Sequence, residues 1–172
     1  ARLVLIAGHD TTANMVALGT LALLTHPDQA AVMRSDLSRA ELTLAVNELF
    51  RWANVTHTGR RRVAPEDDEV GGQLIRAGEG VIVMTSIADR DERVFAEADK
   101  LDLRRANART CMAFGAGDHR CMGAYLSQTE MEIAFETLWK RIPALTLAVP
   151  FETLRFREEG VVYGVHSLPV TW

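Results

Sequence analysis

The stretch from Phe114 to Leu126, which reads FGAGDHRCMGAYL, constrains the fold of this chain more than any other. It surrounds Cys121, one of only two cysteines in 172 residues, with three glycines just ahead of an expected helix. Glycine loses more backbone entropy on folding than other residues and offers no side chain for packing. The stretch therefore predicts a loop whose backbone bends sharply or comes very close to another group.

The composition is that of an ordinary globular protein. Hydrophobic residues make up 48% of the chain and charged residues 24%, and 172 residues suffice for one sizeable core. The net charge of −4 argues against nucleic acid as the main partner. Two cysteines without a CxxC pair favour a reducing compartment and give a structural zinc site little support. We therefore expect a cytoplasmic protein.

An apolar run from Arg2 to Leu24 predicts the first helix. The run is long enough to cross a membrane, but a central acid such as Asp10 costs about 2.5–3.5 kcal/mol on insertion. A buried helix outside any membrane is the better interpretation. Because the run begins without the Ser, Thr, Asp or Asn that usually caps a helix, we expect the C-terminal part of a longer protein.

Two further helices are expected before residue 55. Pro27 begins a short helix, since proline is favoured at the first helical position. Ser38 and Glu41 form a capping box for a longer helix that carries NELFRW and ends near Asn54.

The rest of the chain predicts small β-sheets, a long loop and one more helix. The segments RRRVA, QLIRA and VIVMTS have strand character and are separated by glycines. Residues 88–113 form a long ordered loop, and loops of that length usually have a function. A helix follows Cys121, and ALTLAV and VVYGVHSLPVTW close the chain as strands. The fold class is mainly α with small β-sheets.

Cys121 is the first candidate functional residue. A free cysteine is commonly just a small hydrophobic residue, but backbone amides and the helix dipole favour a thiolate just before a helix. His119 and Arg120 add positive charge. Such a thiolate is a metal ligand or a nucleophile, and no sequence pattern supplies the base that a nucleophile needs.

Two helical segments hold further candidates. In AGHDTT, the threonine hydroxyls could simply bond back to the helix backbone. Alternatively the helix opens locally, with Ala7 and Gly8 leaving room for a flat ligand while Asp10 and Thr11 relay protons. In the second segment, Glu48 and Arg51 lie three residues apart, which by itself is typical of an exposed pair worth a few tenths of a kcal/mol.

Taken together, AGHDTT, ELFR, RRRVAPED, LDLRR and FGAGDHRCMG resemble, in this order, the cytochrome P-450 family of haem-thiolate monooxygenases. FGAGDHRCMG matches the family pattern Phe-Gly-x-Gly-x-His-x-Cys-x-Gly at every fixed position. The resemblance implies that residues 1–172 are the C-terminal haem-binding portion of a single family domain, with its N-terminal part missing. That portion comprises the distal helix, the Glu-x-x-Arg helix, the meander loop, the cysteine loop and the helix after it.

The resemblance also implies a haem site. Cys121 would supply the axial thiolate to the iron of haem b, with Phe114 packed beside the sulfur. Gly115 and Gly123 would let the loop approach the porphyrin. His119 and Arg62 match positions that bind the haem propionates.

On the opposite face of the haem, the resemblance places the first helix. Ala7, Gly8, Asp10 and Thr11 would lie where dioxygen binds. Substrate contacts by position in the family pattern are Thr58, Val161 and Val162.

A structural triad is the remaining implication within the chain. Glu48, Arg51 and Arg105 would lock the charged loop under the haem.

The expected activity is insertion of one oxygen atom from dioxygen into a small hydrophobic organic substrate. A truncated remnant without catalysis is the alternative.

Charge near the cysteine loop bears on the electron donor. Residues 103–121 carry four arginines (Arg104, Arg105, Arg109 and Arg120) against the single acid Asp118. Opposite charges steer encounter between proteins. We expect an acidic ferredoxin or flavodoxin to dock there.

Overall fold

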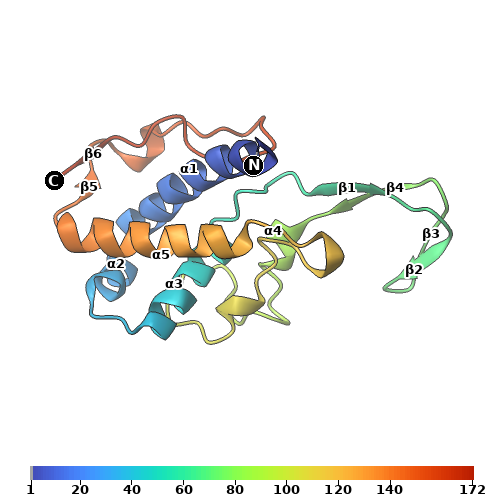
Figure 1. Cartoon of the computed structure of the whole chain (residues 1–172), viewed down its shortest axis with the longest axis horizontal. Coiled ribbons are helices and arrows are strands. Elements are labelled where there is room, and N and C mark those ends of the chain that lie inside the picture. The colour runs from blue at the N-terminus through green and yellow to red at the C-terminus, as the bar shows by residue number, and fades with distance from the viewer. Residues whose placement is uncertain (1) are drawn as a thin grey trace.

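Helices form most of the regular structure that the computed structural model describes over residues 2–172. Figure 1 shows most of the helices gathered in one body, with a β arm projecting away from them. The mainly α architecture with small sheets is as predicted. The helices are α1 (Arg2–Thr25), α2 (Pro27–Arg34), α3 (Arg39–Trp52), α4 (Thr85–Ala88) and α5 (Ala124–Arg141).

Local signals set where two of these helices begin. Pro27 is the first residue of α2, where its missing N–H leaves no hydrogen bond unmade. Ahead of α3, Ser38 Oγ accepts from the Glu41 amide at 3.3 Å and Glu41 Oε2 accepts from the Ser38 amide at 2.8 Å. The predicted capping box is therefore confirmed.

The core lies between α1, α3 and α5. Gly19 of α1 faces Phe135 of α5, and a Cβ atom at Gly19 would overlap the Phe135 ring. The close approach of α1 and α5 therefore requires glycine at this position. Buried apolar side chains of the core come from these helices, from α2, from the loop after α4 and from the C-terminal segment. They include Met15, Leu23, Met33, Leu49, Leu101, Leu103, Met131, Phe135, Trp139 and Val165.

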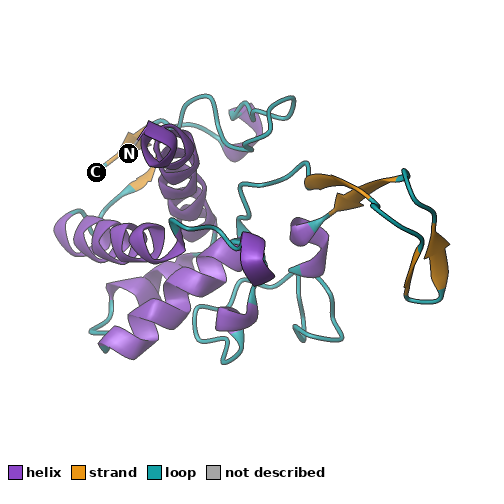
Figure 2. Ribbon diagram, turned by 45° about the vertical axis from the view of Figure 1, so that its right-hand side comes forward, coloured by secondary structure: helices purple, strands orange, loops and turns teal. Residues whose placement is uncertain are grey.

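Two short hairpin pairings build the arm seen in Figures 1 and 2. Strand β1 (Arg60–Val63) pairs antiparallel with β4 (Gly80–Val83), and β2 (Asp68–Val70) pairs antiparallel with β3 (Gln73–Ile75). Gly71 and Gly72 join β2 to β3 with φ of 59° and 80°, values that suit a tight hairpin turn. The three predicted β segments are present, although VIVMTS leaves the strand after Val83 because α4 begins at Thr85.

The two strands predicted at the end of the chain are mostly wrong. Only β5 (Thr146–Leu147) and β6 (Val170–Thr171) pair there, apart from one isolated bridge between Phe156 and Val165. The intervening backbone finds partners outside a ladder. The Tyr163 amide, for example, donates to the Val55 carbonyl at 2.9 Å. Apolar alternation alone could not reveal these long-range bonds.

The segment between α4 and α5 is a long ordered loop, as predicted. Its regular structure is limited to two short 3₁₀ helices, Ala108–Thr110 and Gly117–His119. Leu101 and Leu103 anchor the loop in the core. Within residues 2–172, the structure contains no helix that is both long and apolar enough to cross a membrane.

Candidate functional site

The loop after α4 is held to α3 by a buried ion network. Glu48, with 0% of its surface exposed, accepts from Arg51 Nε at 2.7 Å through Oε2 and from Arg51 Nη2 at 2.8 Å through Oε1. Arg105 Nε lies 3.1 Å from each carboxylate oxygen. The structure thus brings the three predicted triad residues together. The alternative of an exposed Glu48–Arg51 pair is wrong, because both side chains are buried.

The other guanidinium nitrogens of the triad bind loop carbonyls. Arg51 Nη1 donates to Asp89 O at 2.7 Å, and Arg105 Nη1 donates to Ala96 O at 2.6 Å. Further carbonyl acceptors are Ala98 and Lys100. Buried charges are expensive unless hydrogen bonds compensate them, and here backbone oxygens do so. The network therefore determines the path of the loop.

Glycines give the cysteine loop its shape. Gly115 and Gly117 have φ of 69° and 67°, which side chains with a Cβ rarely adopt. The Cys121 amide then donates to Phe114 O at 2.9 Å, and the Cys121 carbonyl accepts from Ala124 at the start of α5 at 3.2 Å. Gly123 is the residue before α5, and a Cβ there would lie 3.8 Å from Cys121 Sγ. The backbone bends sharply, as the sequence predicts.

The two cysteines differ in accessibility. Cys121 is exposed, whereas Cys111 is half-buried. Burial, together with the nearby Asp89 carboxylate, raises the pKa of the Cys111 thiol to about 11. Cys111 therefore stays a neutral thiol at ordinary pH, and Cys121 is the cysteine with the accessible sulfur.

A small cavity lies between the cysteine loop and α1. It measures about 40 Å³ and is lined by Thr11 and Met15 of α1 and by Phe114 and Ser127 on the other side, among others. Phe114 also packs edge-on against Phe50 of α3, with ring centroids 4.7 Å apart. Thr11, which the resemblance places on the dioxygen side of the haem, thus lies across this cavity from the cysteine loop.

The polar cluster of α1 lies on an unbroken helix, so the predicted local opening is absent from the described residues. Thr11 Oγ1 donates to Ala7 O at 2.7 Å, which is the backbone bond of the simpler interpretation. Asp10 Oδ1 accepts from Asn14 Nδ2 and from Arg157 Nη1, both at 3.0 Å. A Cβ atom at Gly8 would meet no atom of residues 2–172 within 4 Å.

Of the arginines of β1, Arg60 and not the predicted Arg62 is the one shown against the cysteine loop. Arg62 is exposed, and its Nη1 donates to Arg61 O at 2.9 Å. Arg60 instead lies against Gly115, its guanidinium carbon 3.6 Å from where a Cβ of Gly115 would be. Its Nη1 is buried and has no hydrogen-bond partner among residues 2–172. Sequence reasoning missed Arg60, although residues two apart on a strand share a face.

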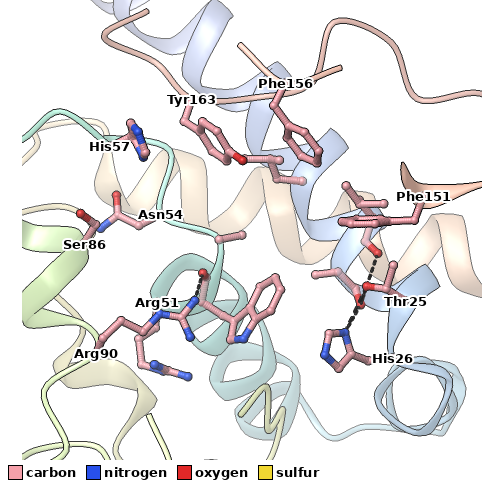
Figure 3. Close-up of a pocket in the computed structure, with 15 residues that line it drawn as sticks. Thr25, His26, Arg51, Asn54, His57, Ser86, Arg90, Phe151, Phe156 and Tyr163 are labelled. Atoms are coloured by element: carbon pink, nitrogen blue, oxygen red, sulfur yellow. Dashed lines mark hydrogen bonds between the residues drawn. The ribbon is translucent and has the colours of Figure 1, made fainter. Parts of the chain in front are cut away.

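The remaining predicted residues lie at the surface or near it. His119 and Val161 are exposed, while Thr58 and Val162 are half-buried. A larger cavity of about 550 Å³, shown in Figure 3, lies elsewhere, between α1, the end of α3 and the C-terminal segment. Its lining includes Arg51, His57, Phe156 and Tyr163 and none of the cysteine-loop residues. It is therefore distinct from the site around Cys121.

Comparison with known proteins decides the family. The cytochrome P-450 family model matches residues 2–143. The chain belongs to the cytochrome P-450 family. It is 48% identical over 168 residues to CYP105Q4 from Mycobacterium marinum, covering 98% of this chain and 41% of that one. Pentalenic acid synthase from Streptomyces avermitilis is 48% identical over 172 residues, covering 100% of this chain and 42% of that one.

Solved cytochrome P-450 structures agree with the fold. The crystal structure of GfsF superposes with a TM-score of 0.95 at 44% identity, covering 99% of this chain and 44% of that one. MoxA from Nonomuraea recticatena superposes with a TM-score of 0.93 at 47% identity, covering 99% of this chain and 41% of that one. The chain thus spans about two-fifths of the length of the cytochrome P-450 relatives it matches and corresponds to their C-terminal portion.

The residues present fit the haem iron that cytochrome P-450 proteins carry. Cys121 offers one accessible sulfur at a loop that glycines leave free of side chains. A haem also carries anionic propionates, and the unpartnered Nη1 of Arg60 beside Gly115 is a buried donor suited to an anion. Both the ligand and the charge complementarity that a haem requires are therefore available on this face.

Proposed function

We propose that this chain forms the haem-binding portion of a monooxygenase that inserts one atom of dioxygen into an organic substrate and reduces the other to water. The observation that carries the proposal is the setting of Cys121, an accessible thiol at a glycine turn before α5. When bound, haem b supplies the iron that activates dioxygen, and a thiolate ligand favours cleavage of the O–O bond.

Residues of the cysteine loop hold the cofactor. Cys121 would bind the haem iron through its sulfur, and Phe114, which packs on Phe50, would lie beside that sulfur. Gly115 and Gly123 would let the loop approach the haem because they carry no side chains. His119 and Arg62 would donate hydrogen bonds to the propionates, and Arg60 would be a third donor because it lies beside Gly115.

Two residues of α1 transfer protons. Asp10 is half-buried and faces Arg157 and Asn14, so it can exchange protons with solvent. Thr11, the next residue, lines the small cavity opposite Phe114. The pair can therefore pass a proton from the surface of α1 toward that cavity, with Ala7 and Gly8 leaving room beside them.

The substrate is a small hydrophobic organic molecule contacted by Thr58, Val161 and Val162. A relative that hydroxylates an organic compound is MycCI from Micromonospora griseorubida, solved with mycinamicin VIII bound, with a TM-score of 0.93 at 40% identity, covering 99% of this chain and 43% of that one. Electrons come from a ferredoxin or flavodoxin. Arg104, Arg109 and Arg120 are exposed, and Arg120 directly precedes Cys121. These charges would attract an acidic donor, an effect that salt weakens.

Replacing each cysteine in turn tests the proposal. In the full-length enzyme that contains this chain, Cys121→Ser should abolish the long-wavelength carbon-monoxide band of the reduced thiolate-ligated haem. Cys111→Ser, the matched control, should keep that band because the Cys111 thiol is neutral and half-buried. If Cys111→Ser removed the band and Cys121→Ser kept it, the ligand assignment would be wrong.

A further inference from the structure

A buried carboxylate outside the proposed haem contacts holds the start of the cysteine loop. Asp89 ends α4 and has 0% of its surface exposed. Its Oδ1 accepts from the Met112 amide at 2.6 Å, and its Oδ2 accepts from Asn54 Nδ2 at 3.0 Å. The carboxylate therefore joins α4, the end of α3 and the chain entering the cysteine loop.

The orientation of the Asn54 amide is determined by other contacts. Asn54 Oδ1 accepts from the Thr56 amide at 2.9 Å and from Thr56 Oγ1 at 2.7 Å. Because its oxygen is occupied by these two donors, Asn54 must present its NH₂ group to Asp89. The group at position 89 must therefore accept one hydrogen bond on each of its two terminal atoms, which a carboxylate does and a carboxamide does not.

Hydrogen bonds continue from Asp89 to the predicted iron ligand. The Met112 carbonyl accepts from the Gly115 amide at 2.8 Å, which closes the first turn of the loop. Across that turn, the Phe114 carbonyl accepts from the Cys121 amide at 2.9 Å. Asp89, Met112 and Phe114 thus form one continuous path that ends at the backbone of Cys121.

We propose that Asp89 is the positioning residue of the cysteine loop, setting the height of Phe114 and Cys121 above α3 through the Met112 amide. The proposal rests on the proposed function, because the position of the cysteine loop affects activity only if Cys121 binds haem. Asp89 itself contacts none of the residues proposed to bind the haem. It acts through the backbone of the loop.

Ionisable groups surround Asp89 on several sides. Arg51 and Glu48 of α3, Arg90 next in the chain and Cys111 of the loop are the charged or titratable neighbours. Burial outweighs the hydrogen bonds and the two arginines and raises the pKa of Asp89 to about 6. Opening of the loop hydrates the carboxylate and returns its pKa toward 3.8, the ordinary value.

With a pKa of about 6 in the closed loop and a lower one in the open loop, the Asp89 carboxyl is ionised in both states above about pH 7. Both of its oxygens can therefore accept hydrogen bonds at that pH.

The test combines hydrogen exchange with the spectrum of the haem-loaded, full-length enzyme. We compare wild type, Asp89→Asn and the control Asp99→Asn, whose side chain is 97% exposed. Asp89→Asn should speed exchange of the Met112 and Cys121 amides by about tenfold to a hundredfold, because an NH₂ group at position 89 then faces one of the two donors. Exchange is measured above about pH 7, where Asp89 is ionised, and Asp99→Asn should exchange like wild type.

The spectrum separates positioning from a purely structural role. Asp89→Asn should also lower the fraction of reduced enzyme that shows the thiolate carbon-monoxide band. Unchanged exchange in Asp89→Asn, or faster exchange with a full thiolate band, would each overturn the proposal. These outcomes are distinct from failure of the ligand assignment, which the two cysteine variants report.

A second variant keeps the proposal testable if Asp89→Asn does not fold. Asn54→Ala removes one donor that holds the Asp89 carboxylate, so exchange of the Met112 amide should be faster than in wild type. Exchange equal to that of wild type would contradict the proposed role of Asp89.

Discussion

Two regions differ in how far the described residues bury them. The contacts that bind the long loop to α3 are well buried, whereas the N-terminal half of α1 is largely exposed. At Glu48 and Arg51, with 0% and 1% of their surface exposed, every charge meets an opposite charge or a backbone carbonyl. In α1, Leu3, Leu5 and Ile6 expose 69%, 70% and 64% of their surface. The support of the cysteine loop is therefore self-contained, whereas the side proposed to bind dioxygen and substrate is not.

The difference follows from how each region obtains its contacts. The triad needs only α3 and the loop that follows α4, and both lie within this chain. The N-terminal half of α1 contacts the rest of the described structure mainly through polar groups, such as Asp10 with Arg157. Buried charge networks fail severely when broken, whereas half-exposed pairs contribute little. This contrast can be tested directly.

The largest expected effect is at Glu48. Glu48→Gln would leave two buried guanidinium groups without their counter-charge, which should cost about 3–5 kcal/mol of unfolding free energy. Urea unfolding of the full-length enzyme measures the loss. Glu136→Gln, which removes an exposed pair with Lys140, is the matched control and should cost less than about 1 kcal/mol. A Glu48→Gln protein of normal stability and haem content that has lost only turnover would contradict the structural role.

A smaller effect is expected at Asp10, and on turnover instead of stability. Positioned proton donors typically contribute about 10²–10⁴-fold, and Asp10→Asn should slow product formation toward the lower end of that range. Substrate binding and unfolding free energy should change little, because Asp10 is half-buried. Stopped-flow turnover and peroxide release are the measurements. Normal product formation without extra peroxide would remove Asp10 from the mechanism.

The smallest effect is expected at Arg157. Its ion pair with Asp10 spans the surface, with 37% and 46% of the two side chains exposed, so Arg157→Gln should cost less than about 1 kcal/mol. Chemical unfolding of Arg157→Gln beside the exposed neighbour variant Arg155→Gln measures this. A loss as large as that of Glu48→Gln would show that the two regions are equally interdependent, against the comparison above.

Much of the local structure could be predicted because its causes are local. The capping box of Ser38 and Glu41 and the left-handed glycines Gly115 and Gly117 depend on residues within a few positions of one another. The order of the motifs along the chain also indicated the family. The closing strands could not be predicted, since the Tyr163 amide bonds to Val55 far away in the sequence.

The sequence by itself determined the starts of α2 and α3, and the order of its motifs indicated the family and singled out the loop cysteine. Only the tertiary structure decided that Arg60 lies beside Gly115 and that Asp89 holds Met112. Burial is the physical reason. Whether a charged side chain is exposed or buried depends on what the fold packs against it, and the neighbouring residues in the sequence do not indicate this.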